Sequence, residues 1–149
     1  MAKFVYRMQN ILEIKYKTET QAKSHYSNMQ NKYNEEQDKL EQMFARKKEL
    51  EDYHRSLATG NLDISELNDS KKAIDFQREL IKKQLVEVKV AQKNLEMARI
   101  RLNEIMKDRK THEKLRENAF DEFLLELSAQ EKKEIDELVS YKYGQEQEE

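Results

Sequence analysis

The side chains that most often catalyse reactions or hold metals are sparse in this chain and are not grouped. Its 149 residues include three histidines and no cysteine. His25, His54 and His112 lie among charged residues, and none has a second ligand at the spacing of a zinc site. Without cysteine there is no thiolate site and no disulfide framework. These residues therefore predict no metal site and no cofactor.

Carboxylates are abundant, but their spacing suits surface ion pairs better than acid–base catalysis. Acidic residues recur three or four positions away from lysine and arginine, which is the spacing of partners on one helix face. Catalysis also needs a pocket that holds its groups in tuned surroundings. The chain has no glycine-rich loop for a phosphate. We therefore expect a protein that is not an enzyme and has no small-molecule substrate.

Apolar side chains could instead recognise a second protein, and the densest group of them lies late in the chain. On a helix this group would cover more than one side, whereas a single partner helix needs only one stripe. The alternative is that the segment folds back on its own chain or dimerises. The group consists of Ala119, Phe120, Phe123, Leu124, Leu125 and Leu127, and it continues with Ile135, Leu138, Val139, Tyr141 and Tyr143.

A second, smaller apolar group comes earlier. Phe76 and Leu80 share one helix face with Lys83 and Glu87, because the four residues are spaced by four, three and four. We expect Phe76 to be largely exposed and Leu80 to lie at the edge. The face is either a binding patch or a plain Phe–Leu contact of the kind that stabilises many helices.

The element that positions both groups is a long helix, expected over residues 64–143. Apolar residues recur in it every seven positions, which is typical of a helix that packs along another helix. Proline is absent from the chain and glycine occurs twice. About 80 helical residues would reach about 120 Å, so we expect a rod rather than a compact domain. The repeat consists of Ile74, Ile81, Val88, Leu95, Leu102 and Phe123, with Arg109 and Arg116 in the same phase.

A first helix is expected over residues 3–58. Its stripe of apolar residues is weaker and more polar than the repeat of the second helix, so the first helix needs a partner helix. Gly60 suits the left-handed position after a helix, and Asp63 followed by Glu66 is typical of a capping box, with Ser65 as the alternative cap. The short hinge, residues 58–63, predicts that the helices fold back antiparallel. The expected fold class is therefore all-α, a long two-helix coiled-coil hairpin forming one elongated domain, with a frayed acidic tail at residues 144–149.

The register of the hairpin follows from the hinge. If the turn centres near Asn61, facing residues have numbers that sum to roughly 122. Arg109 and Arg116 then lie opposite Glu13 and Tyr6, which predicts ion-pair or cation–π partners or a path to water. The second helix outreaches the first by about 24 residues on this register. The facing pairs expected are Ile81 with Leu40 and Met43, Val88 with Tyr33, and Leu95 with Tyr26.

Charge and hydropathy exclude other classes of function. The 28 basic and 30 acidic residues are interspersed and give a net charge of −2, which argues against a nucleic-acid partner. No stretch approaches the ~20 apolar residues of a membrane span, and no signal-peptide run is present. We expect a cytoplasmic protein.

Three segments together resemble the FliJ family, small coiled-coil proteins of the bacterial flagellar type III export apparatus. The opening FVYRMQNIL (residues 4–12) is similar to the family's aromatic start and short apolar helix. The tail QEKKEIDEL (residues 130–138) is similar to its acidic–basic end, and residues 74–85 are similar to the start of its second helix. The three segments occur in the family's order.

The resemblance implies a stalk that inserts its terminal end into the hexameric export ATPase and promotes ring assembly or activity. It also implies contact with the transmembrane export gate, handling of export chaperones, and a place at the inner-membrane export apparatus. Phe76, Leu80 and Lys83 would contact the gate, although Lys83 and Glu87 differ from the family's residues. The positions implied for the ATPase are Phe4, Met8, Phe120, Phe123, Leu124, Leu127, Asp136, Glu137 and Leu138.

Two alternatives stay open at this point. One is the equivalent stalk of a virulence type III secretion system. The other is a prefoldin-like holdase chaperone that would grip unfolded chains with the tips of its hairpin.

Overall fold

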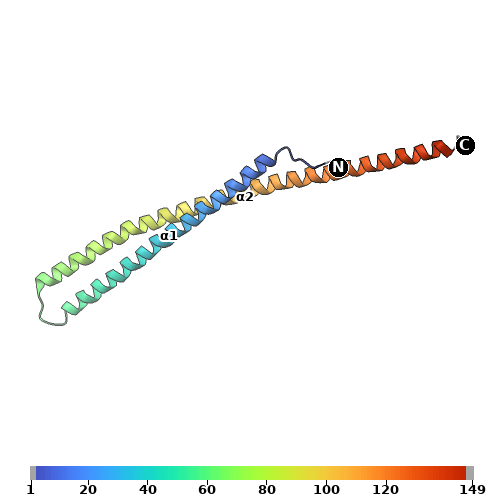
Figure 1. Cartoon of the computed structure of the whole chain (residues 1–149). Coiled ribbons are helices and arrows are strands. Elements are labelled where there is room, and N and C mark those ends of the chain that lie inside the picture. The colour runs from blue at the N-terminus through green and yellow to red at the C-terminus, as the bar shows by residue number, and fades with distance from the viewer. Residues whose placement is uncertain (1–2, 147–149) are drawn as a thin grey trace. The chain divides into compact units, whose positions relative to one another are not determined.

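The computed structural model describes residues 3–146, which form two helices joined by a short hinge (Figure 1). Helix α1 spans Gln9–Leu57 and helix α2 spans Ile64–Glu146, and the described residues contain no strand. The expected all-α fold, with two long helices packed against each other, is confirmed. Between residues 3 and 146, neither helix has a stretch long and apolar enough to cross a membrane.

Helix α2 begins as the capping residues predict. Asp63 Oδ1 accepts the backbone N–H of Ser65 at 2.9 Å and that of Glu66 at 3.5 Å. The Asp63 carbonyl accepts the first helical hydrogen bond, from Leu67 N at 3.0 Å. Asp63 is therefore the N-cap, because its side chain satisfies N–H groups that have no partner within the helix.

The end of α1 differs from the expectation for Gly60. None of the described glycines has a positive φ, so Gly60 does not adopt the left-handed conformation. The helix ends instead in tighter turns, with Ala58 N donating to Arg55 O at 3.2 Å and Thr59 N donating to Ser56 O at 3.3 Å. Such i→i+3 bonds satisfy the last carbonyls without a left-handed residue.

The start of α1 also differs, because residues 3–8 are not helical and the helix begins at Gln9 rather than near Lys3. Residues 7–8 form a turn, in which the Gln9 N–H donates to the Tyr6 carbonyl at 3.2 Å, and residues 3–6 are irregular. This non-helical strap, residues 3–8, places the Phe4 ring against Phe120 and Phe123.

Helix α2 runs to Glu146, which is further than the expected end at residue 143. The first residues of the expected frayed tail, 144–146, are thus helical, and residues 147–149 lie outside the described part of the chain.

Contacts divide the chain into two units, each with a stretch of both helices. The hairpin unit comprises residues 21–103 and includes the hinge. The terminal unit comprises the described residues up to Thr20 together with those from Glu104 onward.

The seam of the hairpin unit follows the predicted seven-residue repeat. Ile74, Ile81 and Val88 are buried on α2, each at most 9% exposed. Ala91 and Ala98, also buried, continue the seam and are small enough for the helices to approach closely. Burial every three or four residues on one side of α2 is what a coiled-coil partner requires.

Polar side chains occupy other seam positions and are hydrogen-bonded across it. Gln84 Nε2 donates to the Glu36 carbonyl at 2.9 Å and to Glu36 Oε2 at 2.6 Å. Gln77 Nε2 donates to the Met43 carbonyl at 2.8 Å. Both pairs agree with the predicted register to within about two residues. Because a slipped register would leave these buried groups without partners, they fix the alignment of the two helices.

The Glu36–Gln84 contact makes stability depend on pH. The hydrogen bond from Gln84, followed by that from Lys32, lowers the pKa of Glu36 from 4.5 to about 2. A carboxylate whose pKa is lowered by folding stabilises the folded state above pH 4.5, and the stabilisation is lost as pH falls toward 2. We expect the melting temperature of the native chain to exceed that of Glu36→Gln at pH 7, and the difference to vanish near pH 2.

Circular dichroism melts of both proteins across this range measure the effect, and Glu35→Gln, at an exposed neighbouring position, is the matched control. A difference between native and Glu36→Gln chains that is constant with pH would contradict the assignment.

Candidate functional site

The terminal unit joins α1 to α2 largely through charged side chains. Arg109 Nε contacts Glu19 Oε2 at 2.5 Å, and its Nη1 contacts Glu113 Oε2 at 2.9 Å. Lys15 Nζ lies 2.7 Å from Asp108 Oδ2 and, through this hydrogen bond, lowers the pKa of Asp108. Of the alternatives left open for Arg109, the structure shows ion pairing, and the partner on α1 is Glu19 rather than Glu13.

A tyrosine completes this network. The Tyr16 hydroxyl donates to Glu113 Oε1, and that hydrogen bond raises the pKa of Tyr16. Glu113 therefore accepts from both Tyr16 and Arg109, which fixes its side chain between the two helices. The only apolar side chain of α1 that is buried in this unit is Leu12, 2% exposed, among the described residues.

Beyond the ion pairs, the strap of residues 3–8 places an aromatic ring on α2. The Phe4 ring meets Phe120 edge-on at 5.1 Å between centroids and lies 5.4 Å from Phe123. The Arg116 guanidinium carbon is 5.8 Å from the Phe4 ring, within cation–π range, and its Nε donates to Gln9 Oε1 at 2.9 Å. Of the alternatives left open for Arg116, the structure shows a cation–π contact, and the ring is that of Phe4 rather than Tyr6.

The strap covers only the beginning of the apolar group. Phe123 is half-buried, whereas Phe120 is 40% exposed even with Phe4 against it. Met8, one of the positions implied for the ATPase, is 45% exposed. Past Phe123, α2 continues to Glu146 (Figure 1). Every described side chain from residue 128 onward is exposed.

We call residues 124–142 of α2 the terminal segment. Its large apolar side chains stand in solvent on several sides of the helix, apart from Leu127, which is half-buried. Asp136 and Glu137 are exposed between them. The exposed apolar residues are Leu124 at 45%, Leu125 at 71%, Ile135 at 59%, Leu138 at 64%, Val139 at 47% and Tyr141 at 66%.

The earlier group, which we call the Phe76 patch, is arranged on α2 as its spacing predicts. Phe76 is 66% exposed, Leu80 is half-buried at the edge of the seam, and Lys83 is exposed. Glu87, the fourth residue of this face, is also exposed. The structure thus brings Phe76, Leu80 and Lys83 to one face of the hairpin unit, away from the terminal segment in sequence.

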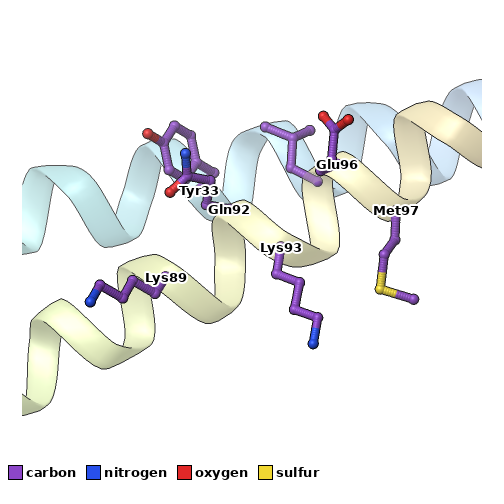
Figure 2. Close-up of a pocket in the computed structure, with 7 residues that line it drawn as sticks. Tyr33, Lys89, Gln92, Lys93, Glu96 and Met97 are labelled. Carbon is purple, nitrogen blue, oxygen red and sulfur yellow. The ribbon is translucent and has the colours of Figure 1, made fainter.

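Open hollows lie on the surface of residues 3–146. One of about 610 Å³ lies in the hairpin unit, where Tyr33 of α1 faces Gln92 of α2 and the side chains of Lys93 and Met97 extend from α2 (Figure 2). Between residues 3 and 146, no three histidine, aspartate or glutamate side chains gather as a metal site would require. His54 instead makes a contact of 3.1 Å from Nδ1 to Ser70 Oγ.

Two features were not found from the residues alone. The Tyr16–Glu113–Arg109–Glu19 network could have been suspected from polar residues in seam phase, but their partners depend on side-chain reach. The non-helical strap could not, because Phe4, Val5 and Met8 fit a helical face equally well.

Comparison with known proteins was made against families, curated proteins and solved structures. The chain matches the model of the family described as "Flagellar FliJ protein" over residues 4–148. No curated protein and no solved structure matches it. Because the family match spans nearly the whole chain, the protein belongs to the FliJ family of flagellar proteins.

Proposed function

We propose that this chain is a non-enzymatic stalk of flagellar protein export, which binds the hexameric export ATPase through its terminal segment and promotes assembly of the ring. Membership of the FliJ family makes the chain a component of flagellar export. The finer assignment rests on the surface of the chain. A coiled-coil member of an export machinery that has no grouped catalytic residues acts through contacts with its partners.

The observation that carries the proposal is the exposed apolar surface of the terminal segment. Leu125 and Leu138 are each more than 60% exposed, on a helix stretch that no residue of α1 covers. Soluble chains seldom leave apolar groups of this density in water unless another protein covers them. Asp136 and Glu137 lie among these residues and suit a partner surface that offers basic groups.

The aromatic residues that precede the terminal segment supply the rest of the proposed contact with the ATPase. Phe120 and Phe123, held by Phe4, form a fixed aromatic base beneath the terminal segment. An aromatic cluster that is already ordered loses little side-chain entropy on binding. Leu124 extends this base along α2 with a half-exposed side chain, and Leu127 lies one turn beyond. Met8 of the strap, also half exposed, is a further proposed contact.

The Phe76 patch is the proposed contact with the export gate, and through it the stalk couples the ATPase to export. An exposed phenylalanine beside an aliphatic residue and a lysine is the composition of a small protein-binding anchor. Export chaperones are further proposed partners. With such partners the chain acts in the cytoplasm, associated peripherally with the inner-membrane export apparatus.

Binding to the purified hexameric ATPase of the same organism tests the proposal. The variant Leu124→Asp/Leu138→Asp places two carboxylates on the terminal segment at exposed positions, 45% and 64%, where they do not disturb the seam. We expect the native chain to co-sediment with the ATPase and the variant to bind at least about tenfold more weakly, since apolar anchors dominate such interfaces.

The matched control is Phe44→Asp/Tyr53→Asp, which changes two exposed rings of the hairpin unit, 45% and 54% exposed. Circular dichroism must show native helix content in both variants. Equal loss of binding in the two, or none in the terminal variant, would count against the terminal segment as the ATPase site.

A further inference from the structure

A second apolar stripe runs along α2 on the side away from the seam. Val86 and Val90 are 57% and 49% exposed, and Met97 and Ile100 are 59% and 46% exposed. With Lys93 between the two pairs, the spacing is four, three, four and three, which keeps all five residues on one helix face. We call Val86, Val90, Lys93, Met97 and Ile100 the outer stripe.

The outer stripe is not part of the contact between α1 and α2. The seam residues Val88, Ala91 and Ala98 are buried, whereas each apolar member of the outer stripe is about half exposed. The two sets are offset by two positions, or about 200° around a helix, so the stripe points roughly opposite the seam. A two-helix hairpin alone gives no reason for β-branched and methionine side chains there.

The width of the outer stripe indicates the shape of the partner that can bind it. Alternating steps of three and four form the narrow row of positions that a single helix covers in a coiled coil. The row spans about two heptads, from Val86 to Ile100, which is enough for four turns of a partner helix.

The charges around the stripe define the chemistry of the partner. Lys89, Lys93 and Arg101 lie in or beside it, and none of them makes an ion pair or side-chain hydrogen bond with any residue in the described part of the chain. Among the acids nearby, Glu96 is already paired with Arg99, and Glu87 and Glu104 lie at the two ends of the stripe. The middle of the stripe is therefore apolar with unpaired cations, and it complements a helix with acidic residues at its edges.

Two other occupants fit less well. In a symmetric pair of chains, Lys93 would approach the same stripe of the second copy and bring its cation toward Lys89 or Lys93 there, which is unfavourable. A membrane-bound helix needs a wide apolar face, whereas this row is narrow and Lys93 interrupts it.

From these observations we infer that the outer stripe is a docking site for an amphipathic α-helix of another protein, with an apolar face and acidic residues at its edges. The site is separate from the terminal segment and does not depend on binding to the ATPase. Docking there would make a local three-helix coiled coil along the hairpin unit.

Synthetic helices test this directly. The acidic probe is a four-heptad peptide with leucine at the a and d positions and glutamate at e and g, and the basic probe has lysine at e and g. Binding to the full-length chain is measured by fluorescence anisotropy of labelled peptide. We expect the acidic probe to bind at least about tenfold more tightly than the basic probe, because edge charges select the partner.

Variants locate the site. Val90→Glu/Met97→Glu should abolish binding of the acidic probe, and the control Phe44→Glu, at a 45% exposed ring of α1, should leave it unchanged. Lys89→Glu/Lys93→Glu should reverse the preference, so that the basic probe binds better. Reversal by charge exchange cannot result from misfolding, since a misfolded stripe would bind neither probe.

The inference is overturned if neither probe binds, if both bind equally, or if the Lys89→Glu/Lys93→Glu exchange leaves the preference unchanged. It is also overturned if Val90→Glu/Met97→Glu removes binding to vesicles of phosphatidylglycerol and phosphatidylcholine, or dissociates a dimer seen in analytical ultracentrifugation, while leaving probe binding intact. Either result would assign the stripe to a membrane surface or to a second copy of the chain.

Discussion

A chain with aspartate in place of Ile81 should lose most of the stability of its hairpin unit. Ile81 is 6% exposed and lies in the middle of the buried repeat between Ile74 and Val88. A carboxylate there would be removed from water without a basic partner, and such substitutions are among the few that cost about 4 kcal/mol or more. Because the seam is one stripe wide, no second layer of the core can compensate.

Thermal and urea unfolding followed by circular dichroism measure the loss. The matched control is Val86→Asp, five positions further on the same helix but 57% exposed, where we expect a change within about 0.5 kcal/mol. Similar losses in the two variants would show that the helices do not pack through the predicted repeat.

Aspartate in place of Phe76 should have the largest effect on binding to the export gate. Phe76 is 66% exposed, so its replacement leaves the seam intact, and helix content should not change. Aromatic anchors at the centre of an interface contribute about 2–4 kcal/mol on truncation, which corresponds to a loss of about thirtyfold or more in affinity. Titration of the gate's cytoplasmic domain with the two proteins measures this loss.

Two controls separate this effect from others. Phe44→Asp changes an exposed phenylalanine of α1 and should bind the gate normally. Phe76→Asp itself should still bind the ATPase, since the terminal segment is unaltered. A gate affinity that is unchanged by Phe76→Asp would remove the Phe76 patch from the proposed function.

Much of the fold could be predicted because it depends on the period of the apolar residues and on capping residues close to the helix ends. Ile74, Ile81 and Val88 recur every seven residues, and that spacing alone indicates which side of α2 is buried. Asp63 identifies the start of α2, because a capping carboxylate acts on N–H groups only two and three residues away. The register follows from the length of the hinge, and Gln84 with Glu36 confirms it.

The parts of the fold that differ from the prediction are those where two local conformations have nearly equal energy. Gly60 permits a left-handed turn but does not require one, and the i→i+3 bonds of Ala58 and Thr59 end α1 equally well. Residues 3–8 have a helical pattern, yet they form a non-helical strap in which Phe4 contacts Phe120 and Phe123. Tertiary contacts of this kind are not encoded in local periodicity.

The candidate surfaces were predictable to different degrees. The terminal segment was predicted from the density of its apolar residues. The Phe76 patch was predicted from the spacing that places its residues on one helix face. The outer stripe was missed because Val86, Val90, Met97 and Ile100 do not stand out until the seam is known and their exposure can be compared with it. The partners of Arg109 and Arg116 were missed by several residues, because long side chains reach neighbouring turns.

Burial of the terminal segment by the ATPase can be observed directly, because the native chain has no cysteine. A single cysteine in place of Leu125, 71% exposed, carries a polarity-sensitive fluorophore, and a second protein carries it in place of Tyr53, 54% exposed in the hairpin unit. Each is titrated with the hexameric ATPase. We predict a saturable blue shift of the label at position 125 and no shift at position 53. Saturable binding in which the label at position 125 stays in water would contradict the account.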